Sequence, residues 1–168
     1  MINKAPFVLA LLGMVGGVFI AILFGVNEEF FKSKIDEGLQ TQPQFQALTD
    51  PQKKQDKIKE EATKNWRYYQ RYHFHATGIG SMSMGVLLLL SLLTGPISLK
   101  RAASYCTAVG GFLYPFVWLF AAIYGPHLGR SVAKEKFVVF GYMGGVFLLG
   151  LILTLILLGL RQPKLEND

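Results

Sequence analysis

The sequence predicts an all-α integral membrane protein, a four-helix transmembrane bundle whose second helix extends far outside the membrane. Of the 168 residues, 51% are hydrophobic, and they are gathered in blocks instead of being dispersed at a helical or strand period. At about 1.5 Å per residue, a block of about 20 residues spans a hydrocarbon layer about 30 Å thick. The blocks also lack the alternation typical of barrel strands, which favours helices. Four blocks fit this description: residues 6–26, 76–94, 105–124 and 137–160.

The first block follows Lys4 and could be mistaken for a secretory signal peptide. Its apolar core is longer than a usual signal sequence, however, and it ends at Asn27-Glu28-Glu29 without a small-residue cleavage site. We therefore expect a retained membrane helix that ends near Val26.

Residues 27–74 are polar enough to lie outside the membrane, with a short amphipathic turn expected around Phe30 and Ile35. Asp50 is a good N-cap and Pro51 suits the first helical position, and no further Gly or Pro occurs before Gly78. The second helix should therefore begin near Pro51 and run unbroken into the membrane. Its first 25 residues would project about 35 Å.

The third block contains Pro115, which predicts a kink. Gly125-Pro126 predicts the end of that helix just before His127, followed by a loop that reaches Lys136. Four spans place both termini on one side of the membrane. The Lys and Arg distribution and the flanks of the first helix disagree about which side is cytoplasmic, so the orientation stays open.

The net charge of +6 could suggest nucleic-acid binding, but no soluble domain carries a basic stripe. Cations at membrane flanks, facing anionic headgroups, explain the excess, so we expect the lipid bilayer and no nucleic acid as a partner. Cys106 is the single cysteine and can form neither an internal disulfide nor a cysteine-based metal site. We expect a bacterial inner membrane or an equivalent energy-transducing membrane.

Small residues recur at helical spacing in three of the blocks. Such stripes let helix backbones approach closely inside a membrane. They favour packing within this chain, and they leave open contact with other membrane subunits or with a second copy. The stripes are Gly13, Gly17, Ala21 and Gly25, then Gly78, Ser81 and Gly85, then Gly141 and Gly145.

All three histidines, His73, His75 and His127, lie at the same ends of the spans as the long polar segment. His75 opens the second span and His127 closes the third. Because those helices are antiparallel, we expect the two imidazoles at a similar depth. Each has arginines nearby: Arg67 and Arg71 share a helix face with His75, and Arg130 follows His127 by three residues.

Haem b is the cofactor that uses these residues together. His75 and His127 would be its axial metal ligands, Gly78 would leave room for the ring, and Arg71 and Arg130, with Arg67 nearby, would meet the propionates. The arrangement is similar to membrane b cytochromes, in which histidines of antiparallel helices hold a haem. It predicts a small electron-transfer protein or a subunit of a respiratory or redox complex, with a possible soluble redox partner.

Other interpretations of the same residues stay open. Histidine, aromatic and arginine side chains are common at membrane interfaces as anchors without a cofactor. Zinc or copper would need a third ligand, and His73 points to a different face from His75. The alternative function is a cofactor-free accessory or assembly subunit of a larger complex. No ionisable residue lies inside a span, and no nucleophile–base pair is evident, so neither a proton pathway nor a stand-alone enzyme is expected.

Overall fold

The computed structural model describes residues 3–160, and these fold into helices joined by short connections. Four helical units are long and apolar enough to cross a membrane: α1, α3, the pair α4–α5, and α7. The prediction of an all-helical chain with four candidate spans is confirmed; residues 1–2 and 161–168 of the predicted domain lie outside the described part. The helices are α1 (Lys4–Gln40), α2 (Pro43–Gln46), α3 (Pro51–Leu92), α4 (Ile97–Leu113), α5 (Phe116–Leu128), α6 (Arg130–Lys136) and α7 (Val138–Leu160).

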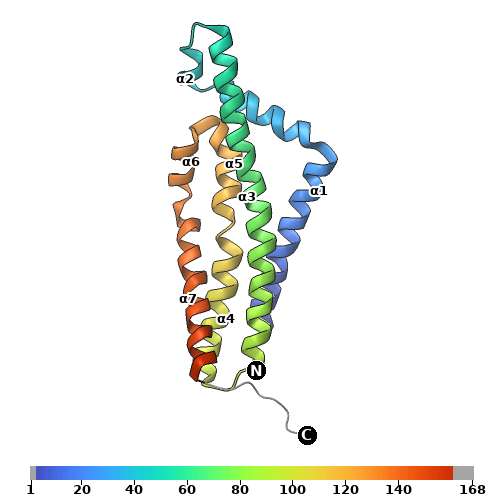
Figure 1. The fold of residues 1–168 in the computed structure, drawn as a ribbon, viewed down its shortest axis with the longest axis vertical. Helices are drawn as coiled ribbons and strands as arrows, with labels where there is room; N and C mark the ends of the chain where they lie inside the picture. The colour runs from blue at the N-terminus through green and yellow to red at the C-terminus, as the bar shows by residue number, and fades with distance from the viewer. Residues whose placement is uncertain (1–2, 161–168) are drawn as a thin grey trace.

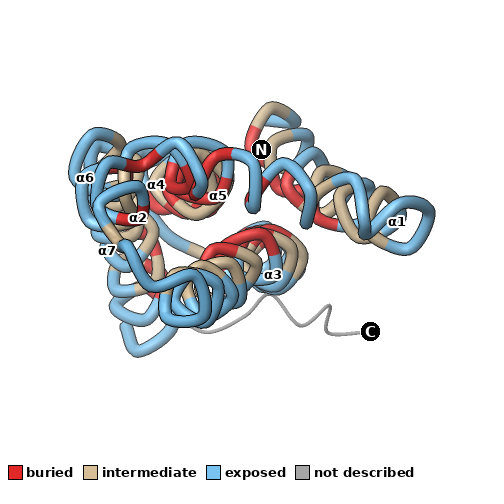
Figure 2. Tube along the Cα trace, turned by 90° about the horizontal axis from the view of Figure 1, so that it is seen from above, coloured by how far each residue is buried: buried red, intermediate tan, exposed pale blue. Residues whose placement is uncertain are grey.

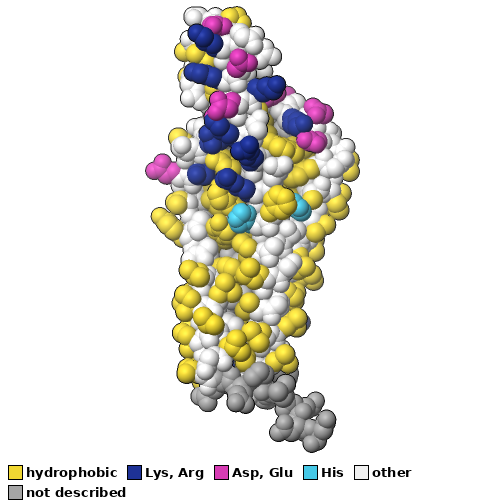
Figure 3. Space-filling model, in the orientation of Figure 1, with side chains coloured by type: hydrophobic (Ala, Val, Ile, Leu, Met, Phe, Trp, Pro, Cys, Tyr) yellow, Lys and Arg dark blue, Asp and Glu magenta, His cyan; other side chains and the backbone are white. Residues whose placement is uncertain are grey.

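The long helices lie side by side, and the outer part of α3 rises above the others (Figure 1). The most extensive contacts are between α1 and α3 and between α4 and α7, while α3 also packs on α4 and α5. Viewed from above, the buried parts of α1, α3, α4 and α5 face one another, and the outward sides are exposed (Figure 2). Charged side chains gather at the end that carries α2, and the longer remainder is mostly apolar (Figure 3).

α1 bends where the first apolar block ends. Asn27 has non-helical dihedral angles (φ −152°, ψ 68°), and its Oδ1 accepts a hydrogen bond from the Phe30 N–H at 3.1 Å, which caps the second part of the helix. Residues 28–40, named the arm below, are helical over a longer stretch than the short turn predicted from the sequence. The arm runs back toward α3 and α5 (Figure 1).

α3 begins where the sequence predicts. The Asp50 carboxylate accepts hydrogen bonds from the backbone N–H groups of Gln52 and Lys53, at 3.0 and 3.2 Å, and Pro51 occupies the first turn. The helix contains 42 residues and is therefore about 63 Å long. That is roughly twice the thickness of a bilayer core.

The third span differs from the prediction at both ends. Its helix starts at Ile97 instead of residue 105, and it continues through Pro126 to Leu128. Pro126 is tolerated in the last turn because it removes a single N–H donor there, and the Gln42 side-chain amide donates to the Pro126 carbonyl at 2.5 Å. The helix ends instead at Gly129, whose φ of +85° few other residues adopt.

The segment predicted as a loop between the third and fourth spans is mostly the helix α6. Pro115 separates α4 from α5, at the position of the predicted kink.

Glycines allow the closest helix approaches. A Cβ atom added to Gly17 of α1 would meet the Thr77 backbone N of α3 at 2.8 Å, and one added to Gly80 would meet Met14 of α1. Gly110 of α4 lies still closer to the backbone of α7 at Phe147. Of the glycines in the predicted small-residue stripes, Gly13 and Gly17 pack against α3, whereas Gly25, Gly78, Gly85 and Gly145 face open space.

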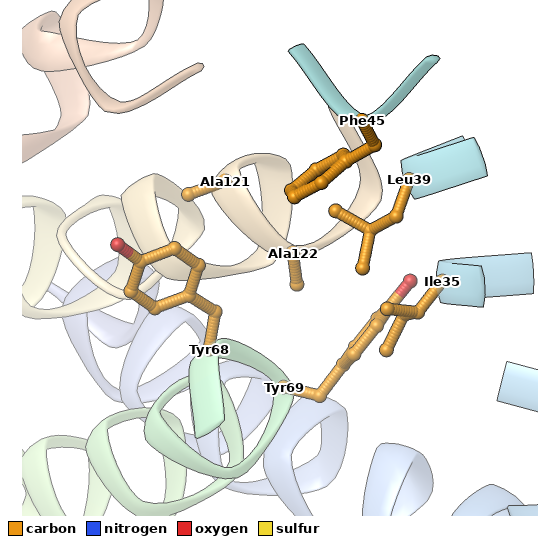
Figure 4. Close-up of a cluster of buried hydrophobic side chains, with 7 residues drawn as sticks. All are labelled: Ile35, Leu39, Phe45, Tyr68, Tyr69, Ala121 and Ala122. Carbon is orange, nitrogen blue, oxygen red and sulfur yellow. The ribbon is translucent and has the colours of Figure 1, made fainter. Parts of the chain in front are cut away.

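The arm is fixed by a buried apolar cluster shared by four elements (Figure 4). The arm and α2 supply three of its side chains, and the rest come from one face each of α3 and α5. This cluster holds the arm against α3 and α5, and Tyr68 and Tyr69 extend the packing of α3 beyond its apolar block. Its members are Ile35, Leu39, Phe45, Tyr68, Tyr69, Ala121 and Ala122.

Candidate functional site

His75 lies on the side of α3 that faces α5. Its Nδ1 is 2.8 Å from the Arg71 carbonyl oxygen, and because a carbonyl can only accept, Nδ1 carries the proton. The Nε2 lone pair is therefore directed away from that bond and is available as an acceptor or ligand. The ring packs on aromatic side chains of the neighbouring helix, 5.5 Å from the Tyr114 ring and 5.9 Å from the Trp118 ring.

His127 lies elsewhere, against the arm. A Cβ atom added to Gly38 would be 3.2 Å from both Cε1 and Nε2 of the His127 ring. The same ring lines a polar cavity of about 580 Å³ together with Gln42, Glu61 and Arg130.

The structure does not bring the two predicted axial ligands together. His127 is nine residues beyond Trp118 along α5, which corresponds to about 14 Å. From the other side, Gly125 faces Asn65 of α3, and Asn65 precedes His75 by ten residues, about 15 Å. The prediction of a shared depth is wrong because the α5 helix continues past its apolar block, so its end lies opposite the outer half of α3.

Arg130 is engaged by an acidic side chain. Its Nε and Nη2 donate to the two oxygens of Glu61 at 2.6 and 3.2 Å, which joins α6 to α3. Partial burial raises the pKa of Glu61, but hydrogen bonds from Arg130 and Lys64 outweigh that effect and hold the pKa below its ordinary value. The predicted role of Arg130 as a free propionate partner is therefore not available while this pair persists.

Arg71 is one helical turn before His75 on α3 and contacts aromatic rings. Its guanidinium carbon is 4.9 Å from the Trp118 ring centroid and 5.6 Å from that of Tyr68. Lys134 of α6 approaches the same Trp118 ring at 6.0 Å. Among residues 3–160, neither Arg71 nor Lys134 forms an ion pair, and the same holds for the exposed Arg67. Two cations from different helices thus converge on one indole.

Gly78 is open, as predicted: a Cβ atom added there would meet nothing within 4 Å, and Gly85 and Gly145 are open in the same sense. Tyr114 lies between α3 and α7, since its ring contacts His75 and is 3.0 Å from the position of a Cβ on Gly144. The predicted residues Arg71, His75 and Gly78 therefore remain on one accessible face.

His73 is directed away from that face. Its Nδ1–H donates to the Gly17 carbonyl of α1 at 2.8 Å. Within the described residues, no group of three or more His, Cys, Asp or Glu side chains is placed to hold a metal ion. A zinc or copper ion bound to His75 would therefore lack the further protein ligands that it needs.

A groove that the sequence did not suggest lies between the arm and the outer half of α3. It encloses about 790 Å³. A stripe along α3 at helical spacing, Ile58, Ala62 and Trp66, forms its apolar side, and that spacing was the available sequence signal. The lining residues are Lys32, Ile35, Asp36 and Gln40 of the arm, and Pro51, Lys54, Gln55, Ile58, Lys59, Ala62, Thr63 and Trp66 of α3.

The charges at this groove are mainly positive. Lys32 is paired with Glu28 at 2.9 Å, but Lys54 and Lys59 form no ion pair within residues 3–160. Asp36 is the acidic member of the lining, and burial, with a smaller contribution from Glu29, raises its pKa.

No known protein family, curated protein or solved structure matches the chain. Two accessible surfaces of the described residues are candidates for a function: the face around His75 and the groove beside the arm.

Proposed function

We propose that the chain is a cofactor-free accessory subunit of a larger membrane complex. Its four apolar helical units cross the membrane as a bundle, and the groove between the arm and α3 binds an acidic, amphipathic segment of a partner protein. The observation that carries this proposal is an apolar groove lined by Lys54 and Lys59, two lysines that form no ion pair within residues 3–160. The membrane is the bacterial inner membrane or an equivalent one.

The dimensions of the groove suit a helical segment. Its α3 wall runs from Pro51 to Trp66, which is about 22 Å along the helix axis. Ile58 and Ala62 offer a continuous apolar strip, which is the surface that an amphipathic helix buries when it binds in a groove. This wall ends at Trp66, ten residues or about 15 Å before the apolar block that starts at Ala76, so it would lie outside the hydrocarbon layer.

The charge pattern selects the partner chemistry. An acidic segment would find Lys54 and Lys59 at the rim without first breaking an ion pair, whereas a basic segment would be repelled. Because the rim is exposed, these lysines contribute to the association rate and specificity, and the apolar strip contributes most of the affinity.

A designed peptide tests this proposal. The probe is a fluorescein-labelled amphipathic helix with Glu on one face and Leu on the other, added to the full chain in nanodiscs. We expect Lys54→Glu with Lys59→Glu, and separately Ile58→Glu, to weaken peptide binding at least about tenfold. Lys57→Glu is the matched control, because Lys57 is on the same helix and does not line the groove.

Two results would contradict the proposal. One is equal binding of the peptide to the parent chain and to the charge-reversed chain. The other is migration of the protein from native membranes as a lone chain in mild detergent, under conditions that keep membrane complexes intact.

A second candidate function is haem b binding through His75 alone, with electron transfer as its use. The hydrogen bond from Nδ1 to the Arg71 carbonyl favours it, because axial histidines commonly donate their other N–H to such an acceptor. Gly78 leaves space beside the ring and Arg71 is free to meet a propionate. His127, Arg130 and the more distant Arg67 are no longer needed in this version.

Absorption spectroscopy separates the two candidates. If haem is bound, the purified protein shows a Soret band that His75→Ala abolishes and that His127→Ala leaves unchanged. A protein prepared under haem-retaining conditions without a Soret band rules out the haem hypothesis and leaves the groove proposal intact.

A further inference from the structure

We infer that Arg71 and Lys134, held against Trp118, form a binding site for the phosphate headgroup of an anionic phospholipid. The site is separate from the groove beside the arm and does not depend on the proposed function. It lies at the boundary between the charged end of the molecule and its apolar length, where Figure 3 shows a group of Lys and Arg side chains just above a histidine.

The two cations are positioned by aromatic contacts and not by acidic side chains. Arg71 is 4.9 Å and Lys134 is 6.0 Å from the Trp118 ring centroid, and they come from α3 and α6 respectively. Like charges drawn to one ring repel each other, so an anion between them lowers the energy of the arrangement. Arg130, on the same α6 helix, is by contrast already neutralised by Glu61.

Trp118 adds a second observation. Its Nε1 atom is buried without a hydrogen-bond acceptor among the described residues, although indole N–H groups usually find an acceptor. A donor of this kind, on a ring that two cations contact and with neither cation in an ion pair within residues 3–160, is suited to a phosphate oxygen, directly or through a water molecule.

The surface below the cations suits the acyl chains of a lipid. Along α3, Gly78 and Gly85 leave open space, and the exposed Met82 lies between them. From Arg71 to Gly85 the helix rises about 21 Å, which exceeds the 15 Å half-thickness of a typical hydrocarbon layer, about 30 Å in all. A diacyl lipid is the anion whose remainder would be accommodated along this strip; a water-soluble phosphate would leave it unused.

Fluorescence quenching by brominated lipids provides the test. The full chain carrying Trp66→Phe, so that Trp118 is the remaining tryptophan, is placed in nanodiscs of phosphatidylcholine with a minor fraction of brominated phosphatidylglycerol or of brominated phosphatidylcholine. We expect the brominated phosphatidylglycerol to quench the Trp118 fluorescence more strongly than the brominated phosphatidylcholine does. Arg71→Gln and Lys134→Gln should each reduce that preference about fivefold.

Lys57→Gln is the control variant. It removes an equal charge from α3 outside the site and should leave the preference for phosphatidylglycerol unchanged. Equal quenching by the two brominated lipids overturns the inference, and so does loss of the preference in Lys57→Gln. Displacement of the effect by millimolar inorganic phosphate would show a site for a free anion and would also overturn it.

Discussion

Between Ala76 and Leu92, α3 meets its neighbours through buried apolar and small side chains, among them Leu87 and Gly80, whereas between Pro51 and Arg71 aromatic rings and charged groups supply much of the contact. The inner half packs Gly80 against Met14 of α1. The outer half is tied by the Glu61–Arg130 pair and by Tyr68 and Tyr69 in the buried cluster. Added volume should therefore damage the inner half most, and changed charge or pH should damage the outer half.

The largest expected effect comes from adding volume to the inner packing. Gly110→Ala on α4 would place a Cβ against the α7 backbone at Phe147 and Met143, which cannot move without separating the two helices. We expect a loss of about 3 kcal/mol in the free energy of unfolding, at any pH. Unfolding of the detergent-purified protein, followed by circular dichroism, measures it; a stability equal to that of the parent chain would show that α4 and α7 are further apart than described.

A smaller effect is expected from the outer ion pair. Glu61→Gln removes a charged partner of Arg130, and we expect a loss of about 1 kcal/mol at neutral pH because both side chains are partly exposed. The pKa of Glu61 is lowered by folding, so its contribution is complete above the ordinary carboxyl pKa of 4.5 and is lost as the pH falls through the lowered value.

Unfolding measured at pH 7 and at pH 3 checks the direction in which the Glu61 contribution changes with pH. The difference in stability between the parent chain and Glu61→Gln should be smaller at pH 3. A difference that grows on acidification would contradict the assignment.

The cap at the start of the arm offers a third test. Asn27→Ala removes the acceptor that caps the arm at the Phe30 N–H, which should cost about 1 kcal/mol and favour a straight continuation of α1. Spin labels introduced at Lys34 of the arm and Lys57 of α3 would then report a longer and broader distance distribution. Ser33→Ala, which changes a neighbouring arm residue, is the control that should leave the distribution unchanged.

The smallest expected effect comes from a comparison of two glycines on different faces of α3. Gly78→Ala fills open space, and alanine is the better helix former, so we expect a gain of about 0.5 kcal/mol. Gly80→Ala, two residues away, should instead destabilise because its Cβ would meet the Ala10 carbonyl and Met14. Equal responses in the thermal unfolding of the two variants would remove the distinction between the faces of α3.

The sequence predicted the ends of helices and apolar blocks correctly where residues close by in the chain decide them. Asp50 and Pro51 start α3, and the polar residues after Val26 end the first apolar block, because capping and burial are decided within a few residues. Pro126 misled because a proline in the last turn removes one N–H donor only, and because the amide that binds the helix-end carbonyl of Pro126 comes from Gln42, far away in the chain. The helical stretch from Ile97 to Ser104 was likewise masked by its polar residues.

The candidate site was predicted only in part. Arg71, His75 and Gly78 are on one helix, so their common face follows from helical spacing alone. The partnership of His75 with His127 required the relative offset of two helices, which apolar block boundaries do not fix. The acidic partner of Arg130 depends on how α6 meets α3, far apart in the sequence. The lysine-lined groove depends on the course of the arm, for which no local pattern in residues 28–40 gives a direction.

The uninterrupted course of α3 from Pro51 to Leu92 has a mechanical consequence. A straight helix transmits tilt and rotation along its axis because every turn is hydrogen-bonded to the next. A load applied near Lys54 would therefore be carried along α3 and would reach α6 and α5 first, through the Glu61–Arg130 pair and the cluster at Tyr68. The helix in that sense couples whatever binds outside the membrane to the packing inside it.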